Sequence, residues 1–283
     1  MIINCNSTTI DLSKGHVMGV LNVTPDSFYD GGKYKDLNLV VSQTKQMLED
    51  GATFIDIGGA STKPGADVVD EKEEINRVIP AINAIKQHAP KAIISIDTTS
   101  SVVAEKAVAS GASIINDISS GTFDDSMLDV VASLGVPFIA MHMQGTPKTM
   151  QKNPTYNYVV DDVFRAMETF RDRAIKQGIQ QIILDPGFGF GKTLSHNYQL
   201  LNRLEKFLSL GHPILVGASR KSMIQKPIDV DAENALNGTT VVNTIAALRG
   251  ASILRVHDVK EAVQVFKIVN YMNQQSSQTS SSL

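Results

Sequence analysis

Eight short apolar runs recur along the chain, and each is followed by a polar residue or a polar loop. The runs are rich in β-branched residues, which is typical of buried strands. The segments between them, such as Val40–Leu48 and Ile75–Ile85, carry apolar residues three and four positions apart, the spacing of a helix face. The runs are Val17–Leu21, Phe54–Ile57, Ile93–Ile96, Ser113–Ile115, Pro137–Met141, Ile182–Leu184, Ile214–Val216 and Ser252–Val256.

Strands that alternate with helices predict a parallel sheet, and eight such units in about 240 residues fit a closed barrel. We therefore expect a single (β/α)8 TIM barrel over residues 16–272, with eight parallel strands and outer helices. Residues 1–15 are expected to form a short hairpin or lid on the closed end of the barrel. The tail, residues 273–283, is rich in Gln, Ser and Thr and is expected to be disordered.

Composition excludes several classes of protein. The net charge of -3 gives no reason to expect nucleic acid or an anionic membrane as a partner. No apolar run approaches the ~20 residues of a membrane span, and the polar N-terminus does not read as a secretory signal. The single cysteine, Cys5, excludes an internal disulfide and suits a reducing cytoplasm. We expect a cytoplasmic protein.

Residues 184–192, with the sequence Leu-Asp-Pro-Gly-Phe-Gly-Phe-Gly-Lys, form the most informative segment. A strand ends there in the carboxylate of Asp185, beside a Gly-rich loop whose backbone can approach a ligand closely. Asp97 and Asn116 also follow strands, and in a closed barrel such residues converge. Two carboxylates and an amide can hydrogen-bond a ring edge rich in N–H donors, such as a pterin or a purine. The alternatives are a tight turn at Asp185 and a helix N-cap at Asp97.

Cationic residues follow the seventh and eighth predicted strands, where barrels of this type often bind phosphate. Arg255 lies within an apolar strand, so it requires a partner or a bound anion, and pairing with a neighbouring Asp is the alternative. Ser222, after Arg220 and Lys221, is expected to begin a helix whose amides attract a carboxylate. His142 is expected to make structural hydrogen bonds. No zinc, Walker A or dinucleotide spacing occurs.

Two loops near the start of the chain complete the candidate site. Asn22 begins a loop that runs to Gly32, expected to be a mobile flap, and its amide oxygen can ligate a hard cation. The second loop, residues 58–65, holds two glycines, two hydroxyls and a lysine, a composition that favours anion binding. A turn residue at Asn22 and a plain solvated second loop are the alternatives.

These motifs together resemble the dihydropteroate synthase family of bacterial folate synthesis, from about residue 16 to residue 270. The resemblance implies a (β/α)8 barrel, a homodimer, Mg2+ and inhibition by sulfonamides. It implies condensation of 6-hydroxymethyl-7,8-dihydropterin pyrophosphate with 4-aminobenzoate, giving 7,8-dihydropteroate and pyrophosphate. The motifs that carry it are residues 22–28 (Asn-Val-Thr-Pro-Asp-Ser-Phe), 185–192, 219–222 (Ser-Arg-Lys-Ser) and 255–258 (Arg-Val-His-Asp).

The resemblance also implies roles for individual residues. Catalysis is expected to depend on Asp97, Asp185, Lys221 and Arg255. The pterin is expected to be held by Asp97, Asn116, Asp185 and Lys221. Pyrophosphate is expected to contact Asn22, Thr62, Lys63, Arg255 and His257, with Asn22 also on Mg2+. The aminobenzoate is expected to lie among Phe28, Pro64, Phe190, Lys221 and Ser222.

The second loop departs from the family pattern. Where family members usually read Glu-Ser-Thr-Arg-Pro-Gly, this chain has Ala60 and Lys63 in place of the glutamate and the arginine. Two other functions remain open. One is a methyltransferase of the methyltetrahydrofolate type, which would not need the cations after the last two strands. The other is a non-catalytic pterin-binding paralogue, in which gaps among the site residues are expected.

Overall fold

The computed structural model describes residues 1–23, 33–60 and 69–279. Eight parallel strands form one sheet in the order β8-β7-β6-β5-β4-β3-β10-β9, and a parallel bridge between Leu184 and Ile214 joins its two ends. The predicted (β/α)8 barrel is therefore confirmed. Its strands are β3 (His16–Asn22), β4 (Phe54–Gly58), β5 (Ile93–Asp97), β6 (Ile114–Asp117), β7 (Phe138–Met141), β8 (Ile182–Asp185), β9 (Leu215–Val216) and β10 (Ile253–Val256).

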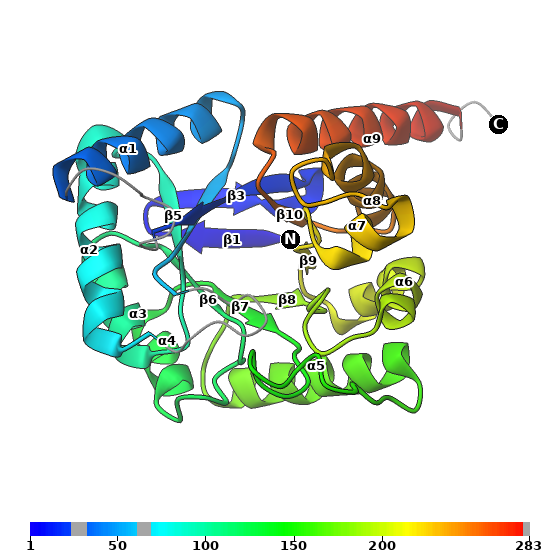
Figure 1. Ribbon diagram of the computed structural model, residues 1–283, viewed down its shortest axis with the longest axis horizontal. Helices are drawn as coiled ribbons and strands as arrows, with labels where there is room; N and C mark the ends of the chain where they lie inside the picture. Colours follow the sequence, from blue (N-terminus) through cyan, green and yellow to red (C-terminus); the bar gives the residue numbers. More distant parts are fainter. Residues whose placement is uncertain (24–32, 61–68, 280–283) are drawn as a thin grey trace.

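Helices surround this sheet as an outer ring (Figure 1). None of the helices in the described part of the chain is long and apolar enough to cross a membrane. They are α1 (Lys33–Glu49), α2 (Glu71–His88), α3 (Ser101–Ala109), α4 (Met127–Leu134), α5 (Val159–Lys176), α6 (Leu194–Asn202), α7 (Ser222–Ile228), α8 (Leu236–Leu248) and α9 (Val259–Thr279), with 3-10 turns at Leu12–Lys14 and Leu204–Leu210.

The C-terminal segment differs from the sequence prediction. We expected disorder from residue 273, but α9 continues to Thr279, and residues 280–283 lie outside the described residues. Val265, Phe266 and Val269 are buried against the barrel, so the first part of the helix is fixed by packing. A helix that is already nucleated adds further residues at little cost, even where these are Gln and Ser.

An antiparallel hairpin, β1 (Ile2–Cys5) and β2 (Thr8–Asp11), covers the amino-terminal ends of the strands. Its apolar side chains join one buried residue from every barrel strand in a single cluster. This cluster fills the interior at that end, so polar side chains inside the barrel lie toward the carboxyl ends of the strands. Its members are Ile3, Cys5, Leu12, Met18, Phe54, Ile93, Ile114, Ile139, Ile183, Leu215 and Ile253.

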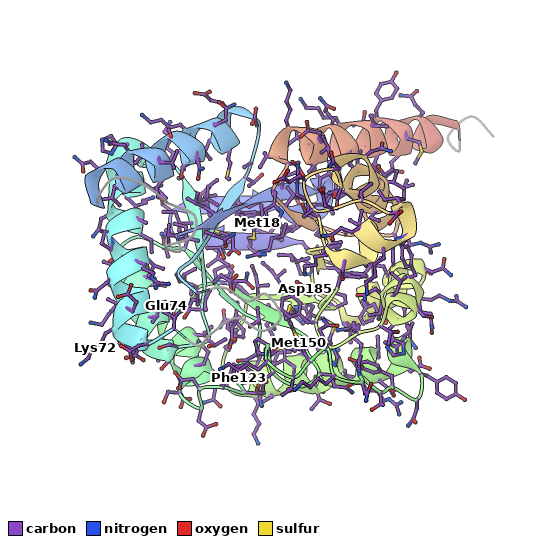
Figure 2. The ribbon with its side chains drawn as sticks, in the orientation of Figure 1. Met18, Lys72, Glu74, Phe123, Met150 and Asp185 are labelled. Atoms are coloured by element: carbon purple, nitrogen blue, oxygen red, sulfur yellow. The ribbon has the colours of Figure 1, made fainter. Side chains whose placement is uncertain are left out.

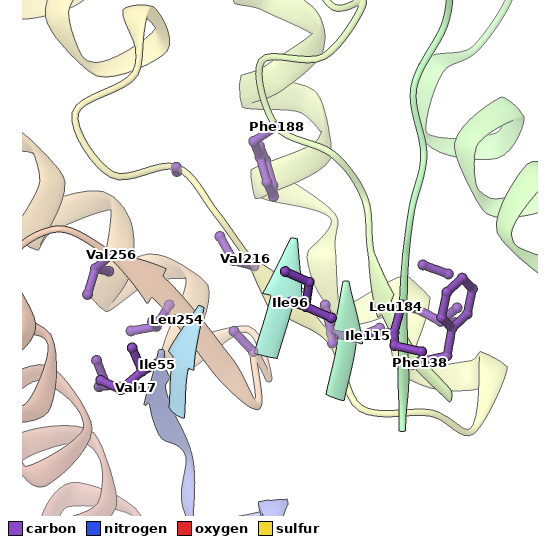
Figure 3. Packing of buried hydrophobic residues seen from close by; sticks show 14 of the residues in the cluster. Val17, Ile55, Ile96, Ile115, Phe138, Leu184, Phe188, Val216, Leu254 and Val256 are labelled. Carbon is purple, nitrogen blue, oxygen red and sulfur yellow. The ribbon is translucent and has the colours of Figure 1, made fainter. Parts of the chain in front are cut away.

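A second and larger cluster packs the outward faces of the strands against the helices (Figure 3). Ile55 and Ile57 of β4 belong to this outer cluster, whereas Phe54 belongs to the interior one. The side chains of a strand alternate between its two faces, so Asp56 shares the interior face with Phe54. The same alternation places Arg255 two positions beyond the interior residue Ile253. Polar groups therefore form the next interior layer.

Candidate active site

Arg255 is the centre of the polar layer. Its Nε lies 2.6 Å from Oδ2 of Asp56, and its Nη2 lies 2.8 Å from Oδ2 of Asp97. The Asn116 amide donates to the same Asp56 oxygen at 3.1 Å. The alternative that Arg255 pairs with aspartates is therefore correct. Its side chain is 20% exposed.

Burial governs the protonation of this network. Asp56 is fully buried and Asp97 is 9% exposed. Burial raises the pKa of Asp97 to about 7, while the Arg255 guanidinium opposes that rise. The two carboxylates raise the pKa of Arg255, which stays charged. The site thus holds a cation, Arg255, between two buried aspartates.

Asp185 extends the site to the adjoining strands. Its Oδ1 accepts a hydrogen bond from the Gly187 amide at 2.7 Å, and its side chain is buried. Burial raises the pKa of Asp185, and the Lys221 charge opposes the rise. A Cβ atom at Gly217 would lie 3.9 Å from Asp185 Oδ2 and from Arg255, so these groups meet at the ends of three neighbouring strands. Asp185 lies toward the centre of the ring of elements (Figure 2).

Lys221 links this carboxylate to the Gly-rich loop. Its Nζ donates to the Phe188 carbonyl at 2.7 Å and lies 4.4 Å from the centroid of the Phe190 ring. Burial lowers the pKa of Lys221 to about 8, and the charge of Asp185 opposes this. Lys221 immediately precedes α7, of which Ser222 is the first residue, so the predicted helix start is confirmed. Ser222 is exposed and accessible to a ligand.

His257 lies beside the end of β10. Its Nδ1 is 3.1 Å from Ser219 Oγ, and its backbone amide donates to the same hydroxyl at 3.2 Å. Enclosure of the ring, followed by the charge of Arg255, lowers the pKa of His257, although the residue as a whole is exposed. Asn22 ends β3 and is exposed at the same edge of the barrel. Arg220 instead forms an ion pair with Asp258 at 2.7 Å.

Four predicted site residues, Phe28, Thr62, Lys63 and Pro64, lie outside the described residues. Among the residues that are described, no cluster of three or more His, Cys, Asp or Glu side chains is suited to a metal ion. Asn22 can offer only a single amide oxygen. That donor fits a magnesium ion held mainly by substrate phosphates and water, and not an ion enclosed by protein ligands.

Sequence reasoning missed Asp56 and left Lys192 without a role. Asp56 lies between Ile55 and Ile57 in an apolar strand, and the argument applied to Arg255, that a buried charge requires a partner, applies to it equally. Lys192 is 3% exposed, and its Nζ lies 3.0 Å from His142 Nδ1. The structural role expected for His142 is therefore confirmed. No local pattern distinguishes Lys192 from an exposed lysine.

Comparison with known proteins supports the same relationship. The model of a family described as pterin binding enzyme matches residues 18–257. The dihydropteroate synthase of Escherichia coli (strain K12) is 48% identical over 264 residues, which cover 93% of this chain and 93% of that protein.

Two solved structures are also similar along nearly the whole chain. The Yersinia pestis dihydropteroate synthase in a sulfonamide drug complex has a TM-score of 0.91 and 43% identity, covering 97% of this chain and 100% of that one. The Xanthomonas albilineans dihydropteroate synthase with 4-aminobenzoic acid has a TM-score of 0.90 and 38% identity, covering 96% and 98%.

Proposed function

Because this chain belongs to the family of pterin binding enzymes, we propose that its strand-end site condenses 6-hydroxymethyl-7,8-dihydropterin pyrophosphate with 4-aminobenzoate. The chain is a transferase of folate biosynthesis that makes 7,8-dihydropteroate and releases pyrophosphate. The observation that carries this function is the interior group of Asp97, Asn116 and Asp185 beside two cations, Lys221 and Arg255. The two cations argue against the methyltransferase. The presence of Asn22, Lys221, Arg255 and His257 argues against a non-catalytic paralogue, in which some of these residues would be missing.

The proposed chemistry follows from the charges of the site. The bond between the pterin methylene carbon and the pyrophosphate oxygen breaks, and the electron pair leaves with pyrophosphate. The amine nitrogen of 4-aminobenzoate then bonds to the methylene carbon and loses a proton. Arg255 stabilises the leaving anion, and the carboxylates of Asp97 and Asp185 stabilise the pterin cation. The protein acts by positioning and electrostatics, without a nucleophile of its own.

The substrate roles of the described residues form part of this proposal. Asp97, Asn116 and Asp185 offer acceptors and a donor to the N–H-rich edge of the pterin, and Arg255 and His257 face the pyrophosphate. Phe190 packs against the aminobenzoate ring, while Lys221 and the amides that begin α7 attract its carboxylate. Phe28, Thr62 and Pro64 are expected to complete the site.

Lys63 is proposed to hold pyrophosphate less firmly than the arginine usual in the family. Lysine keeps the positive charge but lacks the planar fork that contacts two phosphate oxygens at once. Mg2+ is proposed as the metal, with the amide oxygen of Asn22 as its protein ligand. The bound ion would neutralise charge on the pyrophosphate oxygens.

A homodimer and a cytoplasmic location complete the proposal. Large apolar side chains are exposed on α7, α8 and α9, of which α8 and α9 pack side by side (Figure 1). Sedimentation measurements are expected to give twice the chain mass of 30.6 kDa. A reducing cytoplasm suits Cys5, which is free and buried. The exposed large side chains are Ile228, Leu236, Val241, Leu248, Ile268, Tyr271 and Met272.

The deciding experiment measures pyrophosphate release and dihydropteroate formation by the purified protein. Both products should form only when the pterin pyrophosphate, 4-aminobenzoate and Mg2+ are all present. A sulfonamide should inhibit competitively with 4-aminobenzoate, because the two share a ring of similar size and a polar group opposite the amine. Pyrophosphate release that does not require 4-aminobenzoate would contradict the proposed reaction.

A further inference from the structure

Lys192 ends the Gly-rich loop and is buried, at 3% exposure. Lysine is rarely buried to this extent without a specific set of partners. Its Nζ lies 2.8 Å from the Gly187 carbonyl, 3.0 Å from the Phe190 carbonyl and 3.2 Å from the His142 carbonyl. The imidazole Nδ1 of His142 is a fourth acceptor, at 3.0 Å. One ammonium group thus joins both ends of the loop to the end of β7.

The protonation states agree with this arrangement. An ammonium donates all its hydrogens, so His142 must accept through an unprotonated Nδ1 and carry its proton on Nε2. Burial, followed by the Lys192 charge, lowers the pKa of His142 to about 3, which keeps the imidazole neutral. Burial lowers the pKa of Lys192, while the Asp185 carboxylate opposes this change and favours the charged ammonium.

The loop packs so closely against the segment after β7 that two of its glycines have no space for a side chain. Gly187 has φ +72°, and a Cβ atom there would lie 2.0 Å from the His142 carbonyl oxygen. Gly191 has φ +61°, and its Cβ atom would lie 2.4 Å from the Gln144 carbonyl oxygen. The two backbones therefore meet directly, and the Lys192 ammonium bridges them. Three carbonyl oxygens converge on this ammonium, whose positive charge offsets the repulsion among their partial negative charges.

The part of the loop between these glycines contacts Lys221. The Phe188 carbonyl accepts the Lys221 ammonium at 2.7 Å, and the Phe190 ring lies 4.4 Å from the same group. Lys192 in turn binds the carbonyl of Phe190. Phe188 lies beyond the carboxyl ends of the strands (Figure 3). Lys192 therefore binds the backbone of the residue whose ring faces the Lys221 ammonium.

We propose that Lys192, held by His142, is a positioning residue that fixes the Gly187–Gly191 loop and thereby aligns Phe190 and Lys221 for 4-aminobenzoate. The inference rests on the proposed function of the site. Asp97 and Asn116, which are proposed to hold the pterin, lie on β5 and β6, outside this loop. Asp185 accepts a hydrogen bond from the Gly187 amide, so pterin binding should change as well, but to a smaller extent. Loss of Lys192 should therefore raise the KM for 4-aminobenzoate more than the KM for the pterin pyrophosphate. Loss of a purely structural lysine would change both KM values alike.

The test compares Lys192→Met, which keeps the unbranched chain up to Cε but removes the donors, with Lys176→Met on the exposed surface of α5. Lys192→Met should raise the KM for 4-aminobenzoate by about tenfold and change the KM for the pterin pyrophosphate by less than about threefold. Amide exchange in residues 187–191 should accelerate by about tenfold or more, with other peptides unchanged. Lys176→Met should match the wild type in every measurement.

If Lys192→Met does not fold, His142→Ala decides the question, because His142 is only part-buried and three acceptors of Lys192 remain. It should raise the aminobenzoate KM by roughly two- to fivefold at constant pterin KM. Equal changes in both KM values, or unchanged kinetics in a folded variant, would overturn the positioning role alone. A wild type that forms no dihydropteroate would overturn the proposed function and this inference with it.

Discussion

Replacing Asp56 by asparagine tests how the interior charges are held. Asp56 is fully buried, and its Oδ2 accepts from Arg255 Nε at 2.6 Å and from the Asn116 amide at 3.1 Å. Its Oδ1 has no hydrogen-bond partner among the described residues. Asparagine has the same shape, so Asp56→Asn removes the charge without opening a cavity, and it leaves a buried NH2 group without an acceptor.

The magnitude follows from two opposing effects. A hydrogen bond to a charged group contributes about 1.5–3 kcal/mol, and asparagine keeps only a neutral form of it. Removing the Asp56 charge also relieves its repulsion of the Asp97 carboxylate, which contributes to the raised pKa of Asp97. This relief restores part of the lost stability. Arg255 keeps Asp97 as its partner. The loss of about 3–5 kcal/mol expected when a buried ion pair is broken completely is therefore an upper limit. We expect a loss of about 1–3 kcal/mol in the free energy of unfolding.

Urea denaturation followed by far-UV circular dichroism measures this change, since the chain has no tryptophan. Asp125→Asn, at an exposed position, is the matched control and should remain within about 0.5 kcal/mol of the wild type. The variant Arg255→Met and the double variant complete a double-mutant cycle. An Asp56→Asn loss below about 0.5 kcal/mol, or strictly additive losses in the double variant, would refute direct coupling of Asp56 to Arg255.

Three other predictions address the proposed roles. Asp185→Asn should weaken pterin binding by roughly 10- to 100-fold in calorimetric titration, because a buried charged acceptor is lost, and unchanged affinity in folded protein would exclude the role. Ser222→Ala should raise the aminobenzoate KM while the pterin KM stays within about twofold, whereas equal changes would show that the two subsites are misassigned. His142 has a pKa near 3 in the folded protein and about 6.5 when unfolded, so the unfolded state binds more protons between these values. The free energy of unfolding should fall as the pH decreases from about 6.5, by up to about 1.4 kcal/mol per pH unit. Thermal melting of His142→Gln should show a weaker dependence of stability on pH. An identical dependence in the variant and the wild type would mean that His142 titrates normally.

The sequence by itself determined the barrel and most of its polar edge. The apolar runs and the helix spacing are local patterns, and each can be read within a few neighbouring residues. Parallel strands must end on the same side, so the sequence alone predicts that Asp97, Asn116 and Asp185 lie together. The family resemblance added roles for residues such as Phe28 and Lys63, which lie outside the described residues and remain predictions.

The tertiary structure alone decided which charges meet. Asp56 and Arg255 are 199 residues apart, and their ion pair exists only because β4 and β10 present the same interior layer to one closed barrel. Lys192 is buried only because two backbones approach each other around its ammonium. Likewise, α9 continues to Thr279 because its earlier turns pack on the barrel. Periodicity encodes which face a residue occupies, but the partner across that face depends on strand register and closure, which no local segment contains.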